Sequence, residues 1–240
     1  LPMLLSSHSA EMDENRYLFG IREHPSAEFL APPHAHSGYS VIRRIKSKVP
    51  IVLANALDDH PVLAEILAAR ALAHSKDPSK EALVLVVPSV QGDLANSQWA
   101  GTIESLAAKV RRTTGFKSVQ TAYLPDDASQ DARDKAEQTL RATVRGLGGA
   151  GRVIVVALSL SGGSERRLRK IFDGLFVRFD GKGVLPDKKI ARWVEESLAK
   201  GMKLPDMRAF KKDEVPPAAP KKDKLSRPLL APSPEDKETP

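Results

Sequence analysis

The sequence predicts an α/β fold in which a parallel sheet is covered by helices. Two apolar runs of strand length, ALVLVV (residues 82–87) and RVIVVALSL (residues 152–160), are rich in β-branched residues and nearly continuous. Continuous rather than alternating apolar runs are typical of strands that are buried on both faces. Amphipathic helical segments lie between these runs, and the alternation of strand and helix favours parallel pairing.

Two further strands are predicted. KVPIVLA (residues 48–54) carries Pro50 near its start, where a strand accepts proline, and KSVQTAYL (residues 117–124) is more polar. The helical patterns cover residues 60–74, 96–115, 128–149 and 186–201.

The ends of two helices are marked by their residue types. Asp58 and Asp59 are the candidate N-caps of the helix over residues 60–74, which has Pro61 in its first turn. Gly115 follows a basic last turn and is expected to end the helix over residues 96–115.

The composition excludes several kinds of chemistry. The 240 residues can bury a core, and the absence of cysteine excludes disulfides, a thiol nucleophile and a cysteine zinc site. No apolar run approaches the roughly 20 residues that a membrane span needs. The net charge of +7 suits an acidic small molecule or a nucleic acid. Because no RNA-binding or zinc-finger motif accompanies it, no nucleic-acid partner is predicted.

The composition changes near Pro205. From there to residue 240 the chain is rich in proline and lysine and has no hydrophobic periodicity, which predicts a disordered tail.

An internal repeat organises the rest of the chain. LDDHPVLAEILAARALA (residues 57–73) aligns without gaps to LPDKKIARWVEESLAKG (residues 185–201), and each is preceded by an apolar run, small residues and a polar helix. This pattern predicts two copies of one α/β unit, over residues 1–76 and 77–204. The first copy is expected to be incomplete at its start and to carry an insertion over about residues 23–50.

The chain resembles the class II tetrapyrrole chelatases, the group of sirohydrochlorin cobaltochelatase and ferrochelatase. The resemblance covers roughly residues 1–200 and rests on LLSSHS, LDDHPVLAEIL and ALVLVV. It implies two duplicated chelatase-like modules, each with a parallel sheet flanked by helices. It also implies a lyase that inserts Co²⁺ or Fe²⁺, or Ni²⁺ as a further candidate, into sirohydrochlorin or a related tetrapyrrole without a nucleotide. The family works in the cytoplasm, and a periplasmic or exported location stays open if a signal precedes Leu1.

The resemblance also implies roles for particular residues. His8 follows the first apolar run, where the family places a histidine that binds the metal and takes part in catalysis. Neutral imidazole binds these cations and accepts a proton near neutral pH. In the second copy, Pro88 and Gly163, or Ser164 with a shift of one residue, occupy the histidine positions, which predicts a degenerate second module. The alternative for His8 is that it caps or packs beside a helix start.

The insertion contains further candidates. His34 and His36 are predicted to deliver metal or to close over the macrocycle, and Arg43 and Arg44 to contact its carboxylates. A solvated loop explains these four residues nearly as well. Glu11 is either an acid of the helix N-cap or a proton acceptor behind His8.

Two other functions stay open at this point. Pro88 and Gly163 also suit a tetrapyrrole- or metal-binding protein that does not insert metal. A third hypothesis is an α/β interaction module whose basic tail binds an acidic partner.

Overall fold

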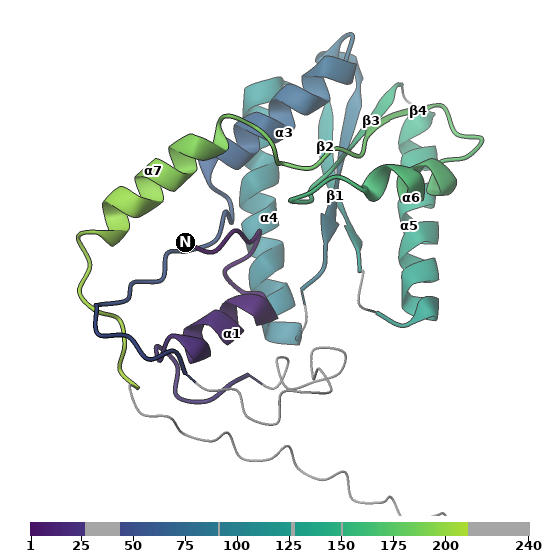
Figure 1. The fold of residues 1–240 in the computed structure, drawn as a ribbon. Helices are drawn as coiled ribbons and strands as arrows, with labels where there is room; N and C mark the ends of the chain where they lie inside the picture. Colours follow the sequence, from purple (N-terminus) through teal and green to yellow (C-terminus); the bar gives the residue numbers. More distant parts are fainter. Residues whose placement is uncertain (27–43, 91, 126–127, 150, 211–240) are drawn as a thin grey trace, which may run out of the picture.

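The structure is a computed structural model that describes residues 1–26, 44–90, 92–125, 128–149 and 151–210. Its centre is a sheet of four parallel strands in the order β2-β1-β3-β4 (Figure 1). The strands are β1 (Ala82–Pro88), β2 (Ser118–Leu124), β3 (Val153–Ala157) and β4 (Val177–Asp180). The predicted α/β class and the predicted parallel sheet are therefore confirmed.

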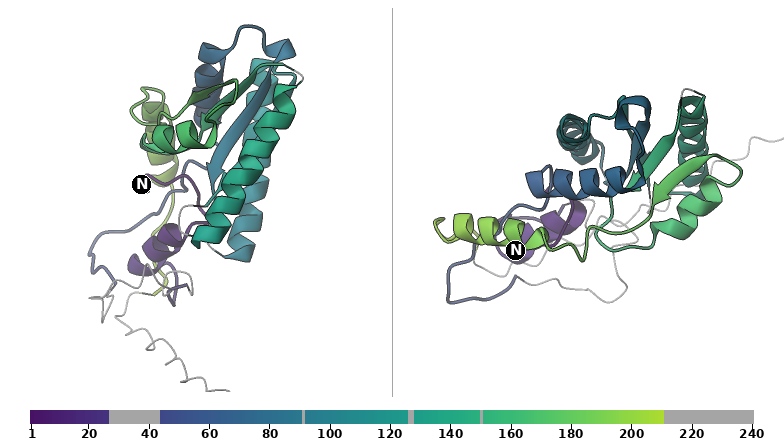
Figure 2. Two further views of the ribbon diagram at one scale, coloured as in Figure 1. Left: turned by 90° about the vertical axis from the view of Figure 1, so that its right-hand side faces the viewer. Right: turned by 90° about the horizontal axis from the view of Figure 1, so that it is seen from above.

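Helices cover both faces of the sheet (Figure 2). The α3, α4 and α7 helices contribute to the core on one face, and α5 and α6 contribute to the core on the other. The described helices are α1 (Ala10–Leu18), α3 (Pro61–His74), α4 (Asp93–Thr114), α5 (Gln130–Gly148), α6 (Ser164–Ile171), α7 (Ile190–Gly201) and the 3₁₀ turn Pro78–Lys80. None of these helices is long and apolar enough to cross a bilayer.

The central strand β1 shows why its sequence is continuously apolar. Leu83 and Leu85 point into the core formed with α3 and α4, whereas Val84 and Val86 point into the core formed with α5 and α6. Since alternate residues of a strand face opposite sides of the sheet, a strand between two helical layers needs apolar residues at every position. Burying each such side chain stabilises the fold by about 1.5–3 kcal/mol.

The start of α3 differs from the prediction. His60 is its N-cap, and its ring Nδ1 accepts a hydrogen bond from the Val62 N–H at 3.3 Å. The Asp58 carboxylate instead accepts a hydrogen bond from Ser7, and the Asp59 carboxylate accepts one from Lys109. The predicted C-cap is confirmed, because Gly115 adopts a left-handed conformation with φ +70° at the end of α4.

The predicted sheet of the first module is not found among the described residues. Residues 48–54 form no strand, so that prediction is wrong. A strand requires a neighbouring strand for its backbone groups. In this segment the Ile51 N–H instead donates to the Asp206 carboxylate, and the Ile51 carbonyl accepts from the Met207 N–H. The α3 helix packs against β3, β4 and α4, so it belongs to the core of the observed sheet. The predicted boundary between two repeated units near residue 76 therefore stays a prediction.

The predicted disorder from Pro205 is wrong for residues 205–210, which we name the C-terminal latch. The Ala209 and Phe210 N–H groups both donate to the Gly20 carbonyl, at 3.0 and 2.9 Å. Arg208 pairs with Asp206 and also donates to the Ser47 carbonyl at 2.8 Å. These bonds connect the latch to the N-terminal region. Residues 211–240 lie outside the described residues.

Candidate functional site

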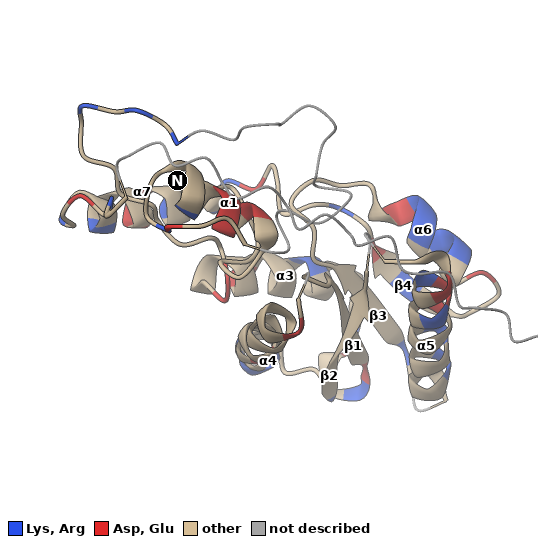
Figure 3. Ribbon diagram, turned by 90° about the horizontal axis from the view of Figure 1, so that it is seen from below, with Lys and Arg blue, Asp and Glu red and all other residues tan. Residues whose placement is uncertain are grey.

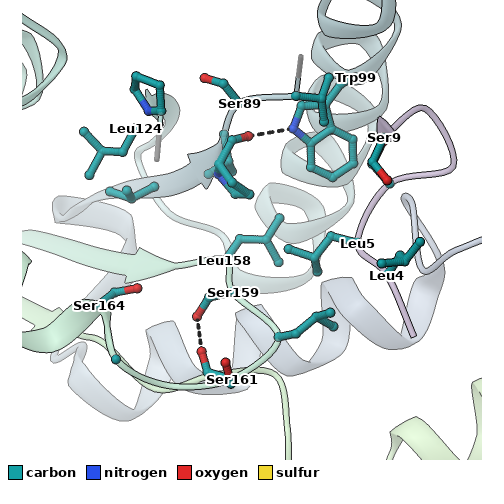
Figure 4. Close-up of a pocket in the computed structure, with 18 of the residues that line it drawn as sticks. Leu4, Leu5, Ser9, Ser89, Trp99, Leu124, Leu158, Ser159, Ser161 and Ser164 are labelled. Atoms are coloured by element: carbon teal, nitrogen blue, oxygen red, sulfur yellow. Dashed lines mark hydrogen bonds between the residues drawn. The ribbon is translucent and has the colours of Figure 1, made fainter. Parts of the chain in front are cut away.

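A cavity of about 690 Å³ lies at the carboxyl ends of the strands (Figure 4). The loops after β1, β2 and β3 contribute to its walls, together with the first residues of α1 and α6. The strand order reverses direction between β1 and β3, and α/β folds bind ligands at this switch point, beyond the carboxyl ends of the strands. The volume is in the usual range for small-molecule sites.

Apolar side chains form most of the walls. Trp99 of α4 is fully buried, and its Nε1–H donates to the Pro88 carbonyl at 2.8 Å, which holds the end of β1 in place (Figure 4). The other large aliphatic lining residues are Leu4, Leu5, Val86, Val87, Val90, Leu124, Leu158, Leu160 and Leu168. Such walls suit a ligand with large apolar faces.

The loop after β3 supplies a polar wall. Ser159 Oγ donates to the Ser161 carbonyl at 2.8 Å, and Ser161, Gly162, Gly163 and Ser164 all line the cavity. Gly163 is the N-cap of α6 with φ +127° and offers no side-chain cap. The first N–H groups of α6 therefore have no side-chain acceptor from their own cap residue.

Glu11 and Arg167 are the charged residues of the lining, and they define an acidic and a basic side of the cavity; their helices, α1 and α6, are coloured by charge in Figure 3. Glu11 of α1 lines it on one side and is exposed. Arg167 of α6 lines it on the other side, where its Nε donates to the Glu137 carboxylate at 2.8 Å. The Glu11 carboxylate suits a cation, whereas the positive charge of Arg167 is shared between the cavity and its partner Glu137.

The His8 loop lies at the acidic side. Ser6 and Ser9 line the cavity, and His8 between them is partly exposed but is not itself one of the described lining residues. The His8 N–H donates to Ser6 Oγ at 3.0 Å. Among the described residues, no group of three or more His, Cys, Asp or Glu side chains could hold a metal ion. Metal binding by His8 stays a prediction.

The structure excludes His8 as the cap of α1 and Glu11 as a capping-box acid, while packing of His8 beside the helix start stays open. Ser9, not His8, caps α1, because Ser9 Oγ accepts from the Met12 N–H at 3.3 Å. Glu11 is then the second residue of the helix rather than the third, so it is not in the position of a capping-box acid. Glu11 is instead a carboxylate at the cavity.

Of the four residues predicted in the insertion, the structure describes only Arg44. His34, His36 and Arg43 lie outside the described residues. Arg44 is described and only 5% exposed; its guanidinium lies 5.0 Å from the Tyr17 ring centre and 5.6 Å from that of Phe210. Arg44 thus connects α1 to the C-terminal latch and does not line the cavity.

Sequence reasoning did not identify Trp99 or Arg167 as lining residues. Both lie in helices, and only the packing of those helices on the sheet brings them to the cavity. The polar wall could have been predicted from SLSGGS (residues 159–164), because this segment, rich in small polar residues, directly follows the apolar run 152–158.

The comparisons with known proteins give one structural match. No protein-family model matches the chain, and no curated protein matches it. The chain is similar to DR2241 from Deinococcus radiodurans, described as a multi-domain protein with structural similarity to chelatases and with two additional novel domains. The TM-score is 0.45 at 17% identity, over 73% of this chain and 36% of that chain, so the chain spans about a third of that protein. A match of this size assigns no family and no activity.

Proposed function

We propose that this chain binds a tetrapyrrole of the sirohydrochlorin class in the cavity, and that His8 delivers Co²⁺ or Fe²⁺ to the bound macrocycle. The observation that supports this proposal best is the cavity at the β1/β3 switch point, with apolar walls, opposite charges at its two sides and the His8 loop at its rim. The reaction itself, metal insertion, is inferred from the resemblance of the sequence to the class II chelatases.

The walls of the cavity fit the chemistry of the macrocycle. Its apolar faces are accommodated by Leu5, Val90 and Leu160, which are partly exposed lining residues from three separate segments of the chain. Its peripheral carboxylates are accommodated by the serine hydroxyls of the loop after β3 and by Arg167, because charge-assisted hydrogen bonds are the strong ones.

The acidic side fits the metal and the protons. A divalent metal that enters the macrocycle replaces two pyrrole protons, so the site needs a metal ligand and a proton acceptor. The neutral His8 imidazole binds the metal and releases it. In this proposal the proton acceptor is the carboxylate of Glu11, the second residue of α1, because it lines the cavity.

The second candidate function is binding without insertion. Two observations favour it: Pro88 and Gly163 occupy the histidine positions of the second copy, and His8 is not a lining residue. In this case the protein carries the macrocycle or its metal complex.

The absorbance of anaerobic sirohydrochlorin with Co²⁺ separates the two functions. We expect the chain to insert Co²⁺ faster than the spontaneous reaction, and His8→Ala to fall to the spontaneous rate. His24→Ala is the matched control, because His24 is exposed and its ion pair among the described residues is with the neighbouring Glu23. A spectral change on binding with no insertion supports the second candidate, and no spectral response contradicts both.

A further inference from the structure

Ser7, the residue before His8, is held by four hydrogen bonds. Its N–H donates to Asp58 Oδ1 at 2.7 Å and its Oγ–H donates to Asp58 Oδ2 at 2.6 Å. The same Oγ accepts from the Ala56 N–H at 2.9 Å, and the Ser7 carbonyl accepts from Arg16 at 2.9 Å. Ser7 is only 6% exposed. Each of its polar groups therefore has a protein partner.

The backbone of Asp58 holds the same segment. The Leu57 and Asp58 N–H groups donate to the Leu4 and Leu5 carbonyls at 3.0 and 2.8 Å. Asp58 has φ +44° and is the only non-glycine residue with positive φ in the described part of the chain. This conformation favours glycine, and aspartate is one of the few other residues that adopt it, at a small backbone cost. Its side chain is the part that a glycine lacks.

The second copy has the backbone pairing without the carboxylate. The Val184 and Leu185 N–H groups donate to the Ser159 and Leu160 carbonyls at 2.7 and 2.8 Å, as residues 57 and 58 do in the first copy. By these hydrogen bonds Leu185 stands where Asp58 does, and by the predicted sequence repeat Pro186 does; neither residue has a carboxylate. The carboxylate is therefore present in the copy that has the histidine. The second copy forms the same backbone hydrogen bonds without it.

We infer that Asp58 is a positioning residue for His8, acting through Ser7. A carboxylate that accepts from both the N–H and the hydroxyl of Ser7 restricts the loop over residues 6–9 to one conformation, with His8 between two lining residues of the cavity. The inference rests on the proposed role of His8 as the metal ligand. Asp58 itself does not line the cavity.

The test uses Asp58→Gly, since glycine accepts the positive φ and lacks the carboxylate. The first readout is the Co²⁺-induced change in the His8 imidazole NMR signal, assigned with His8→Ala. We expect the Co²⁺ dissociation constant of Asp58→Gly to rise roughly tenfold to 100-fold, the range for partners that orient a metal-binding histidine. The control is Asp59→Asn, because the Asp59 carboxylate binds Ser105 and Lys109 and not the loop. It should leave the dissociation constant unchanged.

The second readout is amide hydrogen exchange, which does not depend on metal. We expect exchange at Ser7 and His8 to be about 100-fold faster in Asp58→Gly, with β1 and β3 unchanged. Unchanged exchange at Ser7 overturns the inference, and so does faster exchange with unchanged Co²⁺ binding. If the wild-type His8 signal does not respond to Co²⁺, the proposed function of His8 fails, and the inference fails with it.

Discussion

Single residues show how the fold accommodates buried charge. The Asp180 side chain ends β4, is 4% exposed, and accepts hydrogen bonds from Arg70 Nε at 3.1 Å and from the Lys182 N–H at 2.7 Å. Burial raises the pKa of Asp180, but the hydrogen bonds from Arg70 and Lys182 outweigh it, so the pKa lies below its ordinary value. Because Arg70 belongs to α3, this pair connects the segment before residue 76 to the sheet.

This pair makes stability depend on pH in one direction. The folded-state pKa of Asp180 is lower than the unfolded value of about 3.9, so the charge stabilises the fold above that pH and its contribution is lost as pH falls. We expect Asp180→Asn to lower the free energy of unfolding by about 3 kcal/mol at pH 7. The difference from wild type should decrease below about pH 4. Urea unfolding of wild type and Asp180→Asn at pH 7 and pH 3 measures both effects. An equal difference in the free energy of unfolding at the two pH values contradicts a stabilising charge on Asp180.

The charge of the cavity wall can be changed at one exposed residue. Ser161 lines the cavity from the loop after β3. Ser161→Glu places a carboxylate against an anionic ligand and should weaken sirohydrochlorin binding by about tenfold. Ser161→Lys, the matched variant of opposite charge, should not weaken it. An equal loss in both variants indicates a steric effect and contradicts the proposed carboxylate contact.

At the scale of elements, the C-terminal latch connects distant parts of the chain. Gly20 has φ +70°, and a Cβ added there would lie 2.4 Å from the Phe210 carbonyl oxygen, so the latch packs directly on the turn after α1. Phe210 also covers the buried Arg44 guanidinium. The latch therefore stabilises the end of the helix that follows His8.

Two truncations test the latch. A chain that ends at Leu204 lacks it, and a chain that ends at Phe210 retains it. We expect the shorter chain to be less stable by about 2 kcal/mol, or about 4–8 °C in Tm, because the hydrogen bonds of Met207, Ala209 and Phe210 and the Phe210 ring contact are lost. Equal melting temperatures would show that these contacts contribute little.

The elements differ in how far the sequence could predict them. The strands at residues 82–87 and 152–160 were recognisable because both of their faces are buried. The β4 strand has four residues and includes Arg178 and Asp180, so its short pattern gives no apolar run. Residues 48–54 have a strand-like composition but no neighbouring strand. The latch has the composition of a tail, and its order depends on contacts with residues more than 150 positions away.

The same physical reasons limit the prediction of the site. The resemblance indicated His8, and the pattern SLSGGS after an apolar run indicated a loop at a strand end. The cavity itself depends on the strand order, which no local pattern encodes. Arg44 was predicted as a ligand contact because basic residues suit carboxylates, but its burial depends on the packing of Tyr17 and Phe210.

At the scale of the whole molecule, the cavity lies between the N-terminal segment and the carboxyl edge of the sheet. Leu4 and Leu5 form one side, and the loops after β1 and β3 form the other. A ligand that contacts both sides stabilises them together, since any ligand that binds only the folded state raises its stability.

Thermal unfolding with sirohydrochlorin measures this effect. At about 100 times its dissociation constant, the macrocycle should add about 2.7 kcal/mol to the free energy of unfolding. His8→Ala should show the same increase, because the apolar walls rather than His8 bind the macrocycle. A loss of the increase in His8→Ala contradicts this separation of binding from metal delivery.

A crystal structure of the chain with sirohydrochlorin and Co²⁺ tests the central claim most directly. The account predicts the macrocycle in the cavity between Leu5, Val90 and Leu160, with its carboxylates at the loop after β3 and the metal bonded to the His8 imidazole. A macrocycle bound elsewhere, or a cobalt ion that does not contact His8, would contradict it.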